Sequence, residues 1–189
     1  MTNLYVVSEN GLGFIVDAVE KSQLVTDYIK DNGIKIDFIL QTHTHFDHVL
    51  GLSYYKNLYD VDVYASSDAV DIANDKNYNL AFDYDALNVP IDIYLNDDEI
   101  IKDFNIKAIK TPGHSLDSIS YIVGDVLFSG DTLFKLSIGR TDFPGGDYAT
   151  IINSISEKYG VLNPEMVVYP GHGEKTTLDY EFNNNPFLM

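Results

Sequence analysis

Short apolar runs alternate with polar segments in the first part of the chain. Residues 4–7 and 14–17 are β-type runs separated by a glycine-containing turn, which predicts a hairpin. Ser22 can cap a helix that Asn32-Gly33 would end. The apolar side chains of that helix fall on one face: Leu24, Val25, Tyr28 and Ile29. With a strand at 37–41, the pattern predicts a strand, helix, strand unit with a ligand site after its last strand.

The pattern continues through the middle of the chain with a helix at 49–59, a strand at 61–65 and a second helix capped by Ser66 or Ser67. A loop at 75–90 carries three aromatic residues, Tyr78, Phe82 and Tyr84. Two interpretations stay open. The loop forms a lid or one wall of a pocket, or its aromatic side chains only fix it to the surface.

From residue 91 onward the pattern is dominated by β-type runs. Strands are expected at 91–95, 105–111, 119–123 and 126–129, with Gly124-Asp125 as a tight hairpin turn between the last two. A helix at 148–158, ended by Gly160, leads to a last strand at 166–169. No repeat or linker divides the chain, so we expect a single α/β domain over residues 1–189.

Composition narrows the class of protein. The chain has 189 residues, of which 45% are hydrophobic, so a packed core is expected. It has no 18-residue apolar run and no secretory signal pattern, which predicts a soluble cytoplasmic protein. A net charge of −17 argues against nucleic acid or an anionic membrane as a partner. Because there is no cysteine, any metal must have nitrogen and oxygen ligands.

The residues with metal-binding chemistry are concentrated in a few loops. Three of the five histidines and one aspartate occur within six positions, as His43, His45, Asp47 and His48. The other two histidines each follow a Pro-Gly pair. A single loop histidine is seldom a ligand, but this joint occurrence favours a metal site. In an extended loop Asp47 and His48 point apart, so the loop can serve two adjacent metal ions.

The spacing of these residues resembles the His-x-His-x-Asp-His signature of the metallo-β-lactamase superfamily. Stretches at 111–115, 129–134, 138–142 and 169–173 are similar to the glyoxalase II (hydroxyacylglutathione hydrolase) branch. The similarity runs from Asn3 to the Asn185-Pro186-Phe187 ending. It implies an αβ/βα sandwich of two mixed β-sheets flanked by helices, with metal ions at one edge.

The resemblance also implies a ligand set for two divalent metal ions, expected to be zinc, with iron or manganese as alternatives. One metal would be held by His43, His45 and His114, and the other by Asp47, His48 and His172, with Asp131 bridging them. The nucleophile would be a hydroxide that bridges the metals, and Asp47, Asp131 and His172 would take part in catalysis. Asp17 matches a carboxylate expected to support the ligands.

The same branch implies a small anionic thioester as substrate. A thiolate leaves with little protonation, which suits a site without an obvious extra general acid. Lys135, Arg140 and Lys175 could bind the substrate, although Arg140 could instead form an ion pair with Asp142. Glutathione as the carrier stays open, because only 17 residues follow His172, whereas glyoxalase II enzymes carry a C-terminal helical domain.

Other functions on the same scaffold stay open. Persulfide dioxygenases share a Gly-Arg-Thr-Asp-Phe stretch and use one iron held by two histidines and a carboxylate. Here His43 or His45, His114 and Asp131 could supply that triad. A lactonase, a β-lactamase or another ester or amide hydrolase is a further alternative. A catalytically inactive binding module would have lost ligands, and all seven are present. The sequence does not distinguish a monomer from a homodimer.

Overall fold

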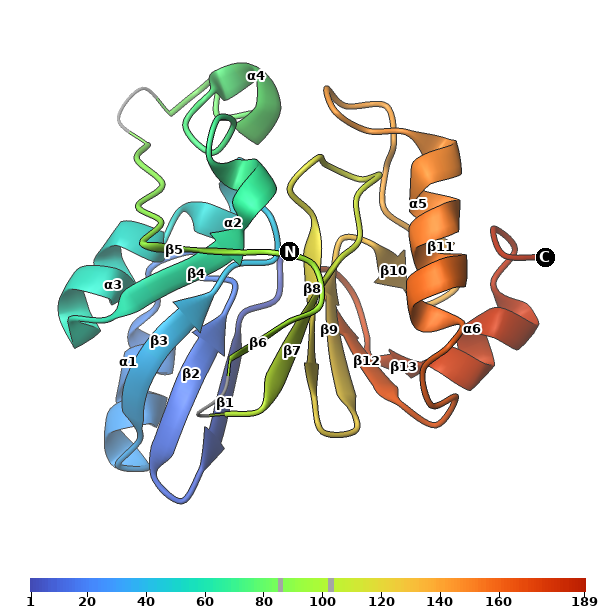
Figure 1. Ribbon diagram of the computed structural model, residues 1–189. Helices are drawn as coiled ribbons and strands as arrows, with labels where there is room; N and C mark the ends of the chain where they lie inside the picture. Colours follow the sequence, from blue (N-terminus) through green and yellow to red (C-terminus); the bar gives the residue numbers. More distant parts are fainter. Residues whose placement is uncertain (85–86, 102–103) are drawn as a thin grey trace.

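Two β-sheets lie side by side with helices on their outer faces in the computed structural model, which describes residues 1–84, 87–101 and 104–189 (Figure 1). The first sheet has the order β1-β2-β3-β4-β5, and the second has the order β13-β12-β9-β8-β7-β6. Each sheet contains both parallel and antiparallel pairs. This confirms the predicted αβ/βα sandwich of two mixed sheets.

The first sheet comprises the N-terminal strands. Its members are β1 (Tyr5–Glu9), β2 (Leu12–Val16), β3 (Lys35–Leu40), β4 (Asp62–Ser66) and β5 (Ile93–Leu95). Its outer face is covered by α1 (Gln23–Asp31) and α3 (Leu52–Tyr59), on the left of the ribbon view (Figure 1). Two shorter helices, α2 (Phe46–Val49) and α4 (Lys76–Asn79), lie in the loops that follow β3 and β4.

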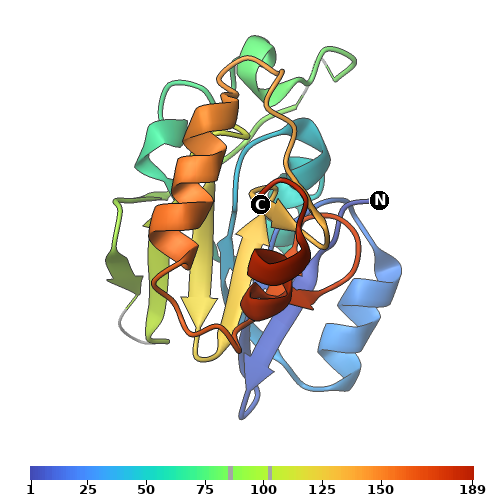
Figure 2. The ribbon, with the colours of Figure 1, turned by 90° about the vertical axis from the view of Figure 1, so that its right-hand side faces the viewer.

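The second sheet comprises the C-terminal strands. Its members are β6 (Glu99–Ile101), β7 (Ile106–Lys110), β8 (Ile119–Val123), β9 (Val126–Gly130), β12 (Val167–Pro170) and β13 (Thr176–Thr177). On its outer side lie α5 (Tyr148–Ser154), which continues as a π-helical turn (Ile155–Tyr159), and α6 (Leu178–Asn184) (Figure 2). A small hairpin of β10 (Leu133–Phe134) and β11 (Ser137–Ile138) follows β9.

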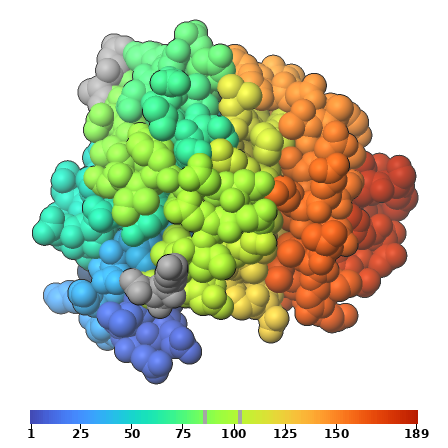
Figure 3. Space-filling view, viewed as in Figure 1, coloured from blue at the N-terminus to red at the C-terminus, as the bar shows by residue number. Residues whose placement is uncertain are grey.

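Alternating side chains on the strands build three layers of apolar core. On β2, Phe14 and Val16 point between the two sheets, whereas Ile15 packs under the helices of the first sheet. On β9, Phe128 joins the central layer and Leu127 packs beneath α5. Burying such a side chain stabilises the fold by about 1.5–3 kcal/mol. In the space-filling view the two halves meet without a gap along the middle of the visible face (Figure 3).

Several helix predictions were wrong in detail. The helix expected at 49–59 is divided into α2 and α3 at Gly51, whose N–H donates to the Ala18 carbonyl at 2.8 Å. A side chain at Gly51 would collide with the backbone of residues 18 and 20. The helix expected after Ser66 is only a 3₁₀ turn, Ser67–Ala69. On α1, Leu24 is 83% exposed and Tyr28 is 55% exposed, so the buried stripe is narrower than predicted.

Other elements were not predicted because they are short or lack a clear pattern. These are β6, β10, β11, β13, α4 and α6. The expected loop at 75–90 contains α4, and its residues 85 and 86 lie outside the described part. Over the described ranges, no helix has the length and apolar character needed to cross a bilayer.

The strand directions bring the chemically important loops to one edge. Strands β7, β9 and β12 run the same way, because β7 and β9 are both antiparallel to β8 and β9 is parallel to β12. The backbone N–H of Ile119 donates to the Thr42 carbonyl at 2.9 Å, which joins the end of β3 to the second sheet. The loops after β3, β7, β9 and β12 therefore converge on a single site.

A buried carboxylate connects α6 to the β10–β11 hairpin. The side chain of Glu181 accepts hydrogen bonds from the Leu136 N–H at 2.8 Å, the Thr176 hydroxyl at 2.6 Å and the Asn185 amide at 2.8 Å. Glu181→Ala would remove the acceptor of all three donors and leave those of Thr176 and Asn185 unpaired in buried positions, at about 1–3 kcal/mol for a group of this kind. We expect the free energy of unfolding to fall by about 2–4 kcal/mol in urea denaturation. The exposed Glu165→Ala control should change it by less than about 0.5 kcal/mol, and equal values for the two variants would contradict this prediction.

Candidate metal centre

The histidine loop follows directly from the buried end of β3. Its three histidines are buried, and the His43 ring lies 4.7 Å from the His45 ring and 4.1 Å from the His48 ring, centroid to centroid. His114, from the loop after β7, lies 4.9 Å from His43. The loops from both sheets thus place four imidazoles in one buried cluster.

All seven residues predicted as metal ligands come together at this edge. Three groups have candidate ligand atoms within 4.8 Å of one another: His43, His45 and His114; His43, His48 and Asp131; and Asp47, His48 and His172. The first and third groups contain the residues expected to bind the two separate metal ions. The middle group joins them.

Asp131 lies between the outer two groups. One oxygen, Oδ1, is 3.3 Å from His48 Nε2. The other, Oδ2, is 3.5 Å from His114 Nε2 and 3.3 Å from His172 Nε2. Asp131 is therefore placed where one carboxylate can reach ligands of both groups.

Several buried polar atoms of the cluster lack a hydrogen-bond partner among the described residues. They include His43 Nε2, His45 Nε2, His48 Nε2 and Asp131 Oδ1. The approach of His48 Nε2 to Asp131 Oδ1 thus lacks hydrogen-bond alignment. Unpaired buried atoms of this kind are unfavourable and rare. A divalent cation would use their lone pairs, and imidazole with carboxylate is a donor set suited to zinc or iron. The residues present fit such a metal.

Glycine keeps the site open beside these atoms. A Cβ at Gly171 would collide with Asp131 Oδ1 and approach His48 Cε1 to 2.7 Å. The Gly171 N–H donates to the Gly130 carbonyl at 2.8 Å, which aligns the loops after β9 and β12. Only glycine leaves the space that the ligand atoms enclose.

The imidazoles of the first group are held neutral. Burial, together with the neighbouring His114, lowers the pKa of His45 to about 3. Burial also lowers the pKa of His43 well below its ordinary value and lowers the pKa of His114. Neutral imidazole is the form that binds a metal, so this group is ready to accept a cation.

The second group has the opposite electrostatics. Burial alone would lower the pKa of His48, but Asp131 and Asp17 raise it well above its ordinary value. Hydrogen bonds to Asp131 and Asp47 raise the pKa of His172 to about 10. Without metal, protons on these two rings balance the carboxylates. A cation bound here would have to displace those protons.

Asp17 supports the second group from behind, as the sequence led us to expect. Its Oδ2 is 2.9 Å from His48 Nδ1 and accepts the Thr42 hydroxyl at 2.8 Å. Its Oδ1 accepts the Thr42 N–H at 2.8 Å and the Gln41 amide at 3.0 Å. This carboxylate orients the His48 ring with Nε2 toward the cluster.

Five of the seven candidate ligands border a cleft of about 490 Å³ with largely apolar walls: His45, Asp47, His114, Asp131 and His172. The apolar side chains that line it are Phe46, Leu80, Phe134, Ile138 and Phe143. Tyr84 stacks on Phe46, with ring centroids 5.5 Å apart. Leu80 thus brings part of the 75–90 loop into one wall of the cleft, whereas Phe82 is 61% exposed.

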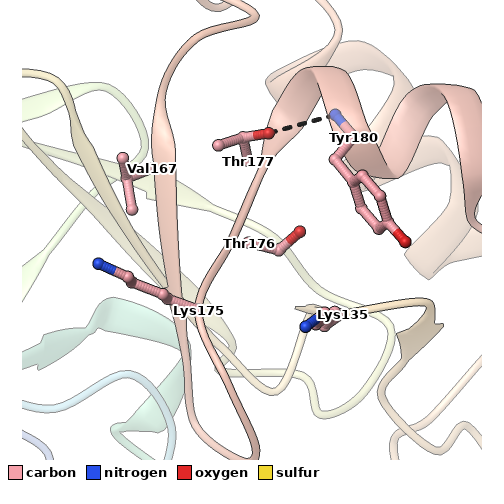
Figure 4. Close-up of a pocket in the computed structure, with 6 residues that line it drawn as sticks. All are labelled: Lys135, Val167, Lys175, Thr176, Thr177 and Tyr180. Atoms are coloured by element: carbon pink, nitrogen blue, oxygen red, sulfur yellow. Dashed lines mark hydrogen bonds between the residues drawn. The ribbon is translucent and has the colours of Figure 1, made fainter.

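The three cations predicted to bind substrate lie in two places. Arg140 lines the metal cleft, where its guanidinium forms two hydrogen bonds to Asp142, at 2.9 and 2.7 Å, and lies 4.2 Å from the Phe143 ring centre. Lys135 and Lys175 line a different pocket of about 530 Å³ beside Tyr180 (Figure 4). That pocket is larger, but none of the seven candidate ligands lines it, so we place the reaction in the metal cleft.

Some residues at the site were not singled out from the sequence. The Thr2 hydroxyl donates to Asp47 Oδ2 at 2.7 Å, and Asp117 contacts residues next to three of the histidines. The closeness of Asp117 to His114 in the chain was the available signal. The contact between Thr2 and Asp47 could not be predicted, because the two residues are far apart in the sequence.

Comparison with known proteins agrees with this geometry. The sequence profile of the metallo-β-lactamase superfamily matches residues 1–172. The probable metallo-hydrolase YqgX of Bacillus subtilis is 35% identical, over 98% of this chain and 92% of that protein. The hydroxyacylglutathione hydrolase GloC of Haemophilus influenzae is 34% identical, over 92% of this chain and 86% of that protein.

Solved structures show the same fold. BLEG-1 B3 metallo-β-lactamase superposes with a TM-score of 0.91 at 33% identity, covering 99% of this chain and 94% of that one. TTHA1623 in a di-iron-bound form gives 0.86 at 29% identity, with 99% and 95% covered. ETHE1 from Myxococcus xanthus gives 0.80 at 25% identity, with 98% and 78% covered. The chain therefore belongs to the metallo-β-lactamase superfamily and has that family's metal-dependent hydrolase fold.

Proposed function

We propose that this protein is a binuclear metal-dependent thioester hydrolase that acts on a small anionic thioester. The observation that carries the proposal is the pair of ligand groups joined at Asp131, five of whose seven residues line one cleft. Two adjacent cations need a shared anionic ligand between them, and Asp131 is the residue suitably placed to provide it.

Divalent cations in such a site polarise a carbonyl group and lower the pKa of water to about 7, which supplies a nucleophile at neutral pH. Contacts within the chain hold the ligand side chains in place. Asp47 and Asp131 both lie 3.3 Å from His172 Nε2, and His172 faces the cleft. The backbone carbonyl of Arg140 lies 2.8 Å from His114 Nδ1 and orients that ring.

The cleft walls suit the acyl part of a thioester. Phe46, Phe134 and Phe143 exclude water from the reacting carbonyl and offer apolar contact to the substrate. A thiolate leaving group needs little protonation, so the reaction does not depend on a separate general acid. The similarity to GloC, a hydroxyacylglutathione hydrolase, supports the same substrate class.

A second candidate is a mono-iron persulfide dioxygenase. The stretch Gly139-Arg140-Thr141-Asp142-Phe143, which that class shares, forms part of the cleft rim. The hydrolase is preferred because all seven ligand candidates are assembled, whereas a single iron would need only two histidines and one carboxylate.

Asp131→Ala should abolish most of the hydrolysis of a lactoyl-glutathione thioester while the fold survives. The substitution removes the shared ligand, so we expect kcat/KM to fall by more than about 100-fold, since losing a group that only supports a ligand already costs about 10–100-fold. Steady-state kinetics and circular dichroism measure the two effects. Asp125→Ala, in the exposed β8–β9 turn, is the control. Full turnover by Asp131→Ala would contradict the mechanism.

Metal content and activity should change together. We expect two zinc ions per chain after reconstitution, loss of thioester hydrolysis after chelation, and recovery when zinc is added back. Elemental analysis paired with the thioester assay tests this. One iron per chain, with oxygen uptake on a glutathione persulfide and no thioester hydrolysis, would instead establish the dioxygenase.

A further inference from the structure

Asp117 is a buried acid that the proposed reaction does not use. Its side chain is 2% exposed, and its two oxygens accept hydrogen bonds from two different loops. Oδ2 accepts the Thr44 hydroxyl at 2.6 Å, and Oδ1 accepts the Ser115 hydroxyl at 2.8 Å. Asp117 itself belongs to the loop after β7, in the second sheet, so its bond to Thr44 joins that loop to the loop after β3, in the first.

The two hydroxyls lie next to metal ligands in the chain. Thr44 stands between His43 and His45, and Ser115 follows His114. Every ligand of the first group is thus one residue from a hydroxyl that Asp117 holds. Across the same junction His114 Nε2 lies 2.9 Å from His45 Nδ1, so a small shift between the loops would change how closely these rings approach.

The charge of Asp117 has no cationic partner among the described residues. No lysine or arginine in the described ranges forms an ion pair with it, and burial raises its pKa. A buried carboxylate without a counter-charge is unfavourable, and a divalent cation at the neighbouring histidines would supply the missing positive charge.

The arrangement parallels that of Asp17, which supports the second ligand group. Asp17 contacts His48 directly and accepts from Thr42 as well. Asp117 instead contacts the residues that flank three ligands. Each outer ligand group therefore has one carboxylate behind it, and the two carboxylates come from different sheets.

From these contacts we infer that Asp117 is a positioning residue for the metal held by His43, His45 and His114. Its hydrogen bonds fix the separation of the two ligand loops, and its charge is balanced by the bound cation. The inference rests on the metal site of the proposed function but not on thioester chemistry. A failed thioester assay would therefore leave it standing.

Asp117→Asn tests the charge, because it keeps the shape of the side chain, and the flanking hydroxyls can rotate to bond an amide. We expect the affinity for one of the two zinc ions per chain to fall about 10- to 100-fold, the range seen when supporting groups are removed, with the other zinc ion unaffected. Titration of the metal-free protein with zinc against a competing chelator measures this. Asp125→Asn, in the exposed β8–β9 turn, makes the same change in net charge and should leave both affinities unchanged.

Stability without metal separates this role from a purely structural one. In metal-free Asp117→Asn we expect an unchanged or higher melting temperature, because an unbalanced buried charge has been removed. Thr44→Val and Ser115→Ala each remove one of the hydrogen bonds to Asp117 but keep its charge, and each should weaken zinc binding several-fold. Wild-type zinc affinity in Asp117→Asn would overturn the inference. A melting temperature of metal-free Asp117→Asn far enough below that of the metal-free wild type to explain the weaker zinc binding would also overturn it. Wild-type zinc affinity in both Thr44→Val and Ser115→Ala would do the same.

Discussion

Four buried histidines and the partly exposed His172 pack beside three carboxylates, and this is the constraint on which the rest of the site depends. Imidazoles packed this closely cannot all be in the positively charged form, because each charge would repel its neighbours in a region with little water. The fold avoids this repulsion because its carboxylates lie closer to His48 and His172 than to the other three histidines. Burial keeps His43, His45 and His114 neutral, whereas Asp17, Asp47 and Asp131 hold protons on His48 and His172. Without metal, the cluster therefore has a neutral half and a charged half.

Strand direction makes this packing possible. The ligand loops leave the carboxyl ends of strands in both sheets, and three apolar layers hold those strands in register. Hydrogen bonds across the junction then align one loop with another, as in the Ile119 N–H bond to Thr42 and the Gly171 N–H bond to Gly130. The loops need no regular structure of their own. The sheets hold the ends of each loop, and hydrogen bonds to the buried carboxylates of Asp17 and Asp117 hold residues within the loops.

The parts of this structure that the sequence predicted are those with a strong local signal. The spacing of His43, His45, Asp47 and His48 identified the ligand loop, and short β-type runs predicted the strands that the structure shows as β2 and β9. The division of the helix at Gly51 depends on contact with residues 18 and 20, which are distant in the sequence, so no local sequence pattern predicted it. Strands of two residues, such as β13, have too few positions for a period to appear. Lys135 and Lys175 follow ligand loops in the chain but line a separate pocket, because the chain turns between β10 and β11 and after His172.

Selectivity on this scaffold cannot be separated from the metal site itself. The backbone carbonyl of Arg140 orients His114, while the side chain of the same residue pairs with Asp142 and lies on Phe143 at the cleft wall. A change in the loop that meets the substrate would therefore also alter the direction of a ligand ring. Related proteins with the same ligand motif can thus differ in reaction without losing a ligand, because the loop that selects the substrate also adjusts the metal's surroundings. In this chain the loop of His114 has a second support besides the Arg140 carbonyl, because Asp117 of the same loop accepts the hydroxyls of Ser115 and of Thr44 in the neighbouring ligand loop.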